Sequence, residues 1–356
     1  MVKTTGSILG TNRPTRIAVL VLLLGFGLAI RLYDVGDLPL DFHPTRQLLS
    51  QLKARGMYFQ KHAELPDWQR RMAIQQWKTK AEVEPEVFER VVALTYEFTG
   101  VQIWVARIYA SVFWIVGAAF LFLLVRELFS LDAAFISAGY FLFWPYAVTA
   151  SRSFQPDVLM VALMLCFWWA FTRWAQTESW FWTVAAGLAG GLAIYVKFVA
   201  AFFIIGAGLG LCLGRFGARF ARRRQLWVMA GLGALPALLY VYYGVVEQGF
   251  LGQQFSGRFI PALLLSPVTF VQWAIMANRA VGALTISVAL LGLLLADDKE
   301  KRSLLLGLWG AYLLFGMFFA YHVTTHDYYH LPLIAVTAVS LGPVVNLVME
   351  RLGRAA

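Results

Sequence analysis

Long apolar segments separated by short polar ones recur along the whole chain. A helix needs ~20 mostly apolar residues to cross a bilayer, because the hydrocarbon core is ~30 Å thick and a helix rises ~1.5 Å per residue. About ten segments approach this length, and they lie near residues 17–30, 103–125, 133–148, 158–175, 180–196, 198–213, 226–246, 281–295, 304–321 and 331–348. This pattern predicts an all-α, polytopic integral membrane protein.

The stretch from 32 to 100 interrupts this pattern because it is far richer in charged positions than the rest of the chain. Apolar residues recur in it at helical spacing, as at Leu48 and Leu52 and again at Trp68 and Met72. Such spacing is typical of amphipathic helices that lie at a membrane surface, with a solvated charged loop as the alternative. We therefore expect one membrane domain over 1–356, with an extracytoplasmic loop over 32–100 and spans over 101–215 and 226–356.

The composition supports a membrane protein and narrows the chemistry. Hydrophobic residues make up 60% of the chain and charged residues only 14%, whereas a soluble domain has about 25% charged residues. The two cysteines, Cys166 and Cys212, both lie inside apolar segments. A disulfide framework and a cysteine-based metal site are therefore not expected.

The distribution of Lys and Arg predicts the orientation. Five arginines gather over 215–224, in a short loop between two predicted spans, and short loops rich in Lys and Arg stay in the cytoplasm. This choice places both termini in the cytoplasm as well. Most of the net charge of +10 then serves orientation, so nucleic-acid binding is not expected. We expect the chain in a bacterial inner membrane.

The same orientation places all five histidines on the extracytoplasmic side, together with the ionisable residues that are hardest to explain structurally. Such residues at the borders of spans are costly and indicate a functional site. The candidates are Asp41, His43, Arg152, Asp157, Lys197, His326, Asp327, Tyr329 and His330.

Each candidate has a functional and a structural interpretation. Asp41, just after the first span, could take a proton from a nucleophile, or could belong to an ordinary turn. Arg152 and Asp157 flank a tight outer turn, where Arg could hold a phosphate and Asp could orient it, or Asp could complement a helix dipole. Lys197 lies between two spans and could attract an anion, or could extend its side chain to the interface.

The last outer turn offers phosphate or metal ligands. His326 and His330 have the i, i+4 spacing of a helical metal site, and Asp327 lies between them. These residues with Asp157 could bind a divalent metal or a phosphate. The Glu of an HExxH motif is absent, which disfavours a metalloprotease. An interfacial belt of tyrosines is the structural alternative.

The order of several short motifs resembles that of a known class. The segments are Arg31-Leu-Tyr-Asp-Val-Gly-Asp-Leu-Pro-Leu, Lys53-Ala-Arg-Gly-Met-Tyr, Ala106-Arg107-Ile-Tyr-Ala-Ser-Val-Phe, Val125-Arg126-Glu-Leu-Phe, Ser151-Arg152-Ser-Phe-Gln-Pro-Asp157, Gly191 to Lys197, and Asp327-Tyr-Tyr-His-Leu-Pro-Leu. Together they resemble the GT-C membrane glycosyltransferases that use polyprenyl-phosphate sugars, the dolichyl-phosphate-mannose-protein mannosyltransferase and aminoarabinose transferase relatives.

This resemblance implies a site for the reaction on the extracytoplasmic face. The expected reaction is an inverting transfer of a sugar from a polyprenyl-phosphate donor to a hydroxyl or amine on a glycan, lipid or protein. An acidic residue of the first loop is then the base, and it maps to Asp41. Many relatives have two adjacent acids where this chain has Asp41, Phe42 and His43, so His43 could occupy the catalytic position instead.

The resemblance also implies that the donor phosphate contacts Arg152, Asp157, Lys197, Tyr329 and His330. No cofactor is expected with certainty, and a divalent metal could take part.

Two other functions would also suit a polytopic chain with these residues. A transporter or flippase for a lipid-linked sugar or anion would show inverted repeats and broken spans, which the sequence does not display. A non-catalytic membrane subunit would use the outer charges to hold a partner.

Overall fold

The computed structural model describes residues 12–80, 84–252 and 257–355, and every regular element within them is a helix. The elements of the first half are α1 (Arg13–Leu32), α2 (Pro44–Lys61), α3 (Asp67–Lys78), α4 (Val87–Thr99), α5 (Ile103–Leu128), α6 (Leu131–Phe143), α7 (Pro145–Ala150), α8 (Pro156–Thr177), α9 (Trp180–Val196), α10 (Ala200–Phe216) and the 3-10 turn η1 (Gly217–Arg222). The predicted all-α fold class is therefore confirmed.

The second half continues with shorter and more broken elements. They are α11 (Arg224–Tyr242), η2 (Tyr243–Glu247), η3 (Pro261–Leu265), α13 (Pro267–Val281), α14 (Ala283–Leu295), α15 (Lys299–Phe318), α16 (Ala320–Thr325), η4 (Asp327–His330), α17 (Leu331–Ser340) and α18 (Gly342–Ala355). Helix α13 was not expected, because Thr269, Gln272, Asn278 and Arg279 interrupt its apolar residues. The chain turns by 93° between α13 and α14 at Gly282, whose φ of +85° favours glycine.

Six of the described helices or helix pairs are long and apolar enough to cross a membrane, or seven if the bent pair α13 and α14 forms one span. Two predicted spans correspond to the shorter apolar helices α6 and α9. Helix α6 ends early because Pro145 cannot continue its hydrogen bonding, and α7 begins there instead. The chain is thus an integral membrane protein by helix length and composition, and the count of about ten spans stays a prediction.

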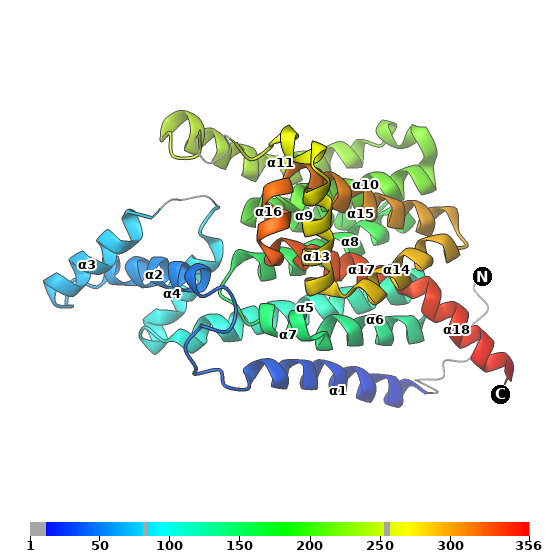
Figure 1. Cartoon of the computed structure of the whole chain (residues 1–356), viewed down its shortest axis with the longest axis horizontal. Helices are drawn as coiled ribbons and strands as arrows, with labels where there is room; N and C mark the ends of the chain where they lie inside the picture. The colour runs from blue at the N-terminus through cyan, green and yellow to red at the C-terminus, as the bar shows by residue number, and fades with distance from the viewer. Residues whose placement is uncertain (1–11, 81–83, 253–256, 356) are drawn as a thin grey trace.

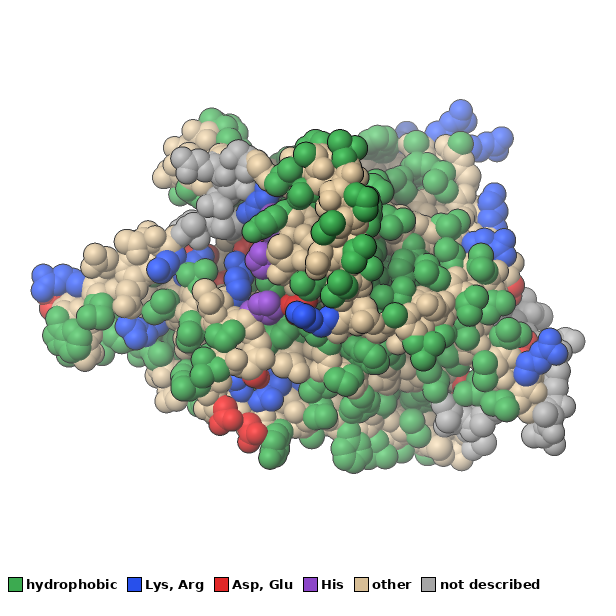
Figure 2. Space-filling model, in the orientation of Figure 1, with side chains coloured by type: hydrophobic (Ala, Val, Ile, Leu, Met, Phe, Trp, Pro, Cys, Tyr) green, Lys and Arg blue, Asp and Glu red, His purple; other side chains and the backbone are tan. Residues whose placement is uncertain are grey.

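The charged first loop forms the helices α2, α3 and α4, which pack against one another and extend from one end of the molecule (Figure 1). The start of α1 and the end of α18 both lie at the opposite end (Figure 1). Figure 2 shows a largely hydrophobic middle, with Lys and Arg at both ends of the molecule and histidines beside the loop helices. Long, apolar helices therefore connect two polar ends.

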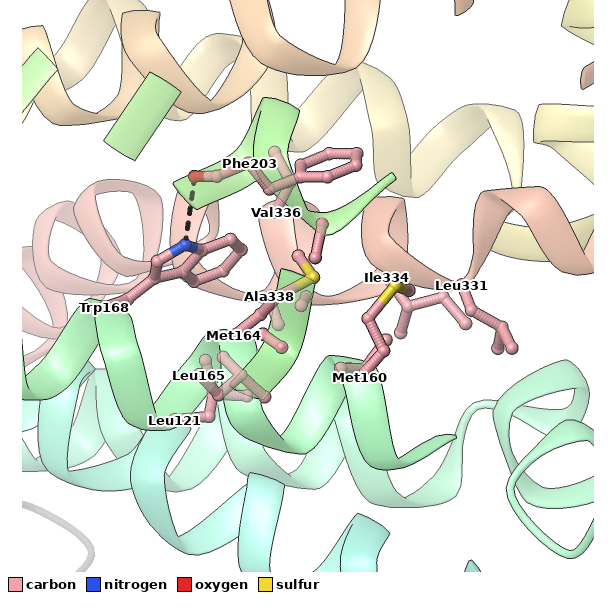
Figure 3. Packing of buried hydrophobic residues seen from close by; sticks show 14 of the residues in the cluster. Leu121, Met160, Met164, Leu165, Trp168, Phe203, Leu331, Ile334, Val336 and Ala338 are labelled. Atoms are coloured by element: carbon pink, nitrogen blue, oxygen red, sulfur yellow. Dashed lines mark hydrogen bonds between the residues drawn. The ribbon is translucent and has the colours of Figure 1, made fainter. Parts of the chain in front are cut away.

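Helix α17 forms the centre of the core, since all ten of its residues are buried. Its apolar side chains face those of α8, such as Met160 and Met164 (Figure 3). Trp168 of α8 also donates its indole N–H to the carbonyl of Phe203 in α10, at 3.3 Å (Figure 3). Because α17 follows η4 directly, this packing fixes the position of η4.

Helices α10 and α15 pack closely along three glycines. A Cβ atom on Gly206 would lie 2.5 Å from the carbonyl oxygen of Gly307, and one on Gly210 would collide with the carbonyl oxygen of Ser303. Small residues at such contacts let the backbones of membrane helices approach. The glycines therefore set the distance between these two helices.

Candidate active site at the end of the helix bundle

Three arginines hold the segment that leaves α1. Arg31 is fully buried at the end of α1 and donates to Ser151 Oγ at 2.6 Å and to the carbonyl of Leu142 at 2.8 Å. Arg152 donates to the carbonyl oxygens of Tyr33 at 2.5 Å and Asp34 at 3.2 Å. Burial and the positive charge of nearby Arg107 lower the pKa of Arg152. In the structure Arg152 thus secures the backbone of the first loop.

Arg107 of α5 and Gln47 of α2 fix Asp41. Arg107 donates to the carbonyl of Leu38 at 3.0 Å and to Asp41 Oδ1 at 3.2 Å. The fully buried Gln47 donates to the same Asp41 oxygen at 3.4 Å and accepts the backbone N–H of Phe154 at 3.2 Å. Sequence reasoning missed Gln47, because a lone Gln in a polar helix carries no signal. Asp41 is therefore tied to both α5 and the turn before α8.

His43 contacts a residue from the far end of the chain. Its Nε2 lies 2.5 Å from Asp327 Oδ1, although the two residues are 284 positions apart. Its ring also packs edge-on against Tyr328, with the ring centroids 4.9 Å apart. The backbone of His43 is left-handed with φ of +44°, which is uncommon for a residue other than glycine. Pro44 then occupies the first turn of α2 and starts that helix.

Asp41 and His43 open onto one cavity of about 450 Å³. The cavity brings together the first loop, α7, α13 and η4, and its lining residues are Asp41, Phe42, His43, Pro145, Tyr146, Thr149, Arg279 and Asp327. Arg279 Nη1 lies 3.8 Å from Asp327 Oδ2. Two candidate bases and a cation thus face the same open space.

Lys197 and Asp157 form a buried ion pair beside this cavity. Lys197 ends α9 with extended backbone, and its Nζ lies 2.8 and 2.9 Å from the two carboxylate oxygens of Asp157 at the start of α8. The rings of Tyr328 and Tyr329 lie 5.2 and 5.0 Å from the same ammonium group. Burial alone would lower the pKa of Lys197, but the carboxylates of Asp157 and Glu84 outweigh it and raise the pKa. These contacts therefore favour the charged form of Lys197.

Glu84 connects this pair to the first loop. Its Oε1 lies 3.7 Å from Lys197 Nζ and its Oε2 lies 3.5 Å from Arg46 Nη2. Burial would raise the pKa of Glu84, yet the charges of Lys197 and Arg46 lower it overall. Both distances exceed those of a close hydrogen bond. Sequence reasoning missed Glu84 and Arg46, because both lie among many charged residues of the first loop.

The three histidines close to η4 differ in their surroundings. His330 is fully buried, and its nitrogens contact the Tyr312 hydroxyl at 2.8 Å and the Val323 carbonyl at 2.9 Å. His322 Nε2 lies 3.3 Å from Arg258, and burial with this positive charge lowers the pKa of His322 to about 4. His326 Nδ1 lies 2.7 Å from the Thr325 hydroxyl. His330 thus holds η4 in place, whereas the lowered pKa of His322 favours its neutral form.

The sequence left open a metal site among Asp157, His326, Asp327 and His330. Within the described part of the chain, no group of three or more His, Cys, Asp or Glu side chains is arranged to hold a metal ion. Asp157 faces Lys197 and Asp327 faces His43. We therefore assign no metal ligand among these residues.

The fold is that of the GT-C membrane glycosyltransferases. It resembles ArnT from Cupriavidus metallidurans bound to undecaprenyl phosphate, with a TM-score of 0.61 and 18% identity over 96% of this chain and 62% of that one. It also resembles the archaeal oligosaccharyltransferase AglB from Archaeoglobus fulgidus in complex with an inhibitory peptide and a dolichol-phosphate, with a TM-score of 0.57 and 14% identity over 96% of this chain and 51% of that one.

The sequence agrees with this fold. Residues 83–243 match the family model described as dolichyl-phosphate-mannose-protein mannosyltransferase, which confirms the resemblance found in the sequence motifs. The match covers α4 to α11, including Arg107, Asp157 and Lys197, while Asp41, His43 and Asp327 lie outside it. Comparison with the curated proteins finds no match. The chain spans about three fifths of the length of ArnT.

Proposed function

We propose that the chain transfers a sugar from a polyprenyl-phosphate donor to an acceptor hydroxyl or amine on the extracytoplasmic side of the membrane. One observation carries the proposal. A cavity lined by Asp41 and His43 lies beside the buried cation Lys197 and the half-buried cation Arg46, and the ring of Tyr328 contacts His43 and both cations. Sugar transfer needs a proton acceptor and a cation for the departing phosphate at such neighbouring positions.

The cations are suited to the leaving group. Negative charge grows on the donor phosphate as its bond to the sugar breaks, and a fixed cation stabilises that charge best where water is excluded. Lys197 is only 3% exposed, and Asp157 and the two tyrosine rings hold it in place. We propose that Lys197, Arg46 and Tyr329 contact the phosphate, that Asp157 orients Lys197, and that Arg152 and His330 act through the loops they secure.

The base lies on the first loop. Asp41 is the residue to which the family resemblance assigns this role, and His43 is the alternative on the same cavity. Attack from the side opposite the phosphate would invert the configuration of the anomeric carbon. The acceptor can approach through the cavity, which opens between the first loop, α7 and α13.

The proposed sidedness follows from the charges. The arginines of η1 and the start of α11 favour the cytoplasm by the positive-inside rule. The start of α1 and the end of α18 lie away from α2–α4 (Figure 1), so both termini are then cytoplasmic. We propose that α2–α4 lie at the outer membrane surface, where Trp68 and Phe98, which are 60% and 90% exposed, would insert into the headgroup region.

A transfer assay with purified protein tests this function. Membranes of a strain deleted for the chain, labelled in their polyprenyl-phosphate sugars, supply both donor and acceptor. The chain should move label from the polyprenyl-phosphate fraction to an acceptor and release an equal amount of polyprenyl phosphate. Lys197→Met should reduce this transfer by about 10²-fold or more, by loss of electrostatic stabilisation. Label that stays in the polyprenyl-phosphate fraction, or merely crosses the bilayer within it, would contradict the proposal.

The same assay reports on sidedness. In sealed proteoliposomes, cleavage by protease added outside shows whether the loop helices α2–α4 face outward. Vesicles with these helices outside should label an acceptor that cannot cross the membrane. Labelling that occurs only when α2–α4 are inside would overturn the proposed sidedness and leave the activity standing.

A further inference from the structure

A hydrogen-bonded pair of His43 and Asp327 joins the first outer loop to the last outer turn inside the cavity. The Nε2 to Oδ1 distance is 2.5 Å, and the side chain of Asp327 is only 13% exposed. A carboxylate next to a histidine nitrogen favours the tautomer in which that nitrogen carries the proton. His43 Nε2–H then donates to Asp327 and leaves the lone pair on Nδ1.

The other nitrogen of His43 is free to react. Among the described residues, none makes a hydrogen bond to His43 Nδ1, and the side chain is 31% exposed on the cavity. A histidine with one nitrogen held by a carboxylate and the other open to substrate has the arrangement of a general base with its orienting acid. The pair thus has the geometry needed to accept a proton from a molecule in the cavity.

We propose that His43 is the general base of this chain and that Asp327 is its positioning residue. This assignment rests on the proposed transfer. The acceptor oxygen or nitrogen forms a bond to the anomeric carbon, while the bond from that carbon to the phosphate oxygen breaks and its electron pair leaves with the phosphate. The acceptor proton moves to His43 Nδ1. The carboxylate of Asp327 stabilises the resulting imidazolium, so no further reactant is needed.

Asp41 has a different role on this assignment. Its Oδ1 accepts hydrogen bonds from Arg107 at 3.2 Å and from Gln47 at 3.4 Å. Both donors belong to buried side chains that also hold backbone carbonyls of the first loop. Asp41 therefore fastens the loop that carries His43 to α5 and α2, and acts as a positioning residue.

Other charged and titratable groups surround the pair on several elements. They are Asp41 on the first loop, Arg46 on α2, Tyr146 on α7, Arg279 on α13, His326 before η4, and Tyr328 on η4. Arg279 lies 3.8 Å from Asp327 and shares its carboxylate with His43. Among the residues that the structure describes, Asp327 is the carboxylate in direct contact with the imidazole, so changing it should affect His43 most strongly.

The pH dependence of transfer in the labelled-membrane assay tests this assignment. Wild-type activity should fall toward acidic pH, because a protonated imidazole cannot take the proton of the acceptor. His43→Gln should lower the rate by about 10²-fold or more and remove this acid limb. Asp327→Asn should reduce the rate and move the acid limb to lower pH, because the charge that favours the protonated ring is gone. Asp327→Glu should restore the limb toward its original position.

The control variant is His62→Gln. His62 lies at the end of α2 and contacts Glu64 and Glu97, away from the cavity residues, so this change should leave the rate and the acid limb unaltered. Binding of undecaprenyl phosphate by His43→Gln and Asp327→Glu shows that both variants are folded with an intact donor site. Retention of half the transfer by His43→Gln, or an unshifted acid limb in Asp327→Asn, would overturn the assignment. Absence of transfer by the unmodified chain would instead contradict the proposed function.

Discussion

Glu84 occupies the position between two cations that a donor phosphate would need. Its carboxylate oxygens lie 3.7 Å from Lys197 and 3.5 Å from Arg46, so Glu84 itself is held only loosely by the two cations, whereas Asp157 holds Lys197 closely. A phosphate offers more negative charge and more acceptor oxygens than a carboxylate. Donor binding should therefore displace Glu84 from these contacts.

This displacement gives a prediction at the residue scale. Glu84→Gln removes the competing charge, so undecaprenyl phosphate should bind about threefold to tenfold more tightly, a gain of roughly 1 kcal/mol for a partly buried charge. Titration of the detergent-solubilised protein measures the dissociation constant. Glu64→Gln is the matched control, because the side chain of Glu64 is 69% exposed and contacts His62 instead. Unchanged or weaker binding by Glu84→Gln would contradict this role.

The structure brings together several residues that the sequence had singled out, but the sequence did not predict their partners. Asp41, His43, Asp157, Lys197 and Asp327 were all predicted to belong to the site, because ionisable groups at the ends of apolar segments are costly. The pairing of His43 with Asp327 across 284 positions depends on how η4 packs beside the first loop. A single sequence contains no signal for such a distant contact.

At the scale of helices, the contact between α10 and α15 depends on the absence of side chains. A Cβ atom on Gly210 would collide with the Ser303 carbonyl, whereas one on Gly231 in α11 would meet nothing within 4 Å. Gly210→Ala should therefore lower the free energy of unfolding by about 1–3 kcal/mol through overpacking. Gly231→Ala should leave it unchanged or raise it, because alanine favours helix by up to about 1 kcal/mol.

Thermal unfolding in detergent compares these two variants. A melting temperature lower for Gly210→Ala than for Gly231→Ala is the expected result. Equal melting temperatures would show that α10 and α15 can separate without cost, and would contradict the proposed role of the glycines.

Helix type was predictable from the sequence, but helix ends and bends were less so. The apolar pattern indicated α5, α8 and α10 within a few residues of their observed bounds. Helix α13 escaped detection because polar residues interrupt it, although it contributes Arg279 to the cavity. A helix that borders a polar site loses the continuous apolar pattern by which spans are recognised.

For the whole molecule, the histidines distinguish one end from the other. Lys and Arg lie at both ends, whereas the histidines in view lie beside the loop helices (Figure 2). The buried helix α17 connects the two ends and carries η4 at the end that holds the cavity. The sequence predicts the orientation of these ends from the arginines over 215–224, because topology depends on the composition of short loops.

We propose that the donor phosphate binds at the end that holds the cavity, within reach of Lys197. A structure of the chain with undecaprenyl phosphate tests that claim most directly. The phosphate should lie within hydrogen-bonding distance of Lys197 Nζ or the Arg46 guanidinium and border the cavity of Asp41 and His43, with Glu84 moved away. A phosphate bound at the opposite end, or in contact with neither cation, would contradict the account.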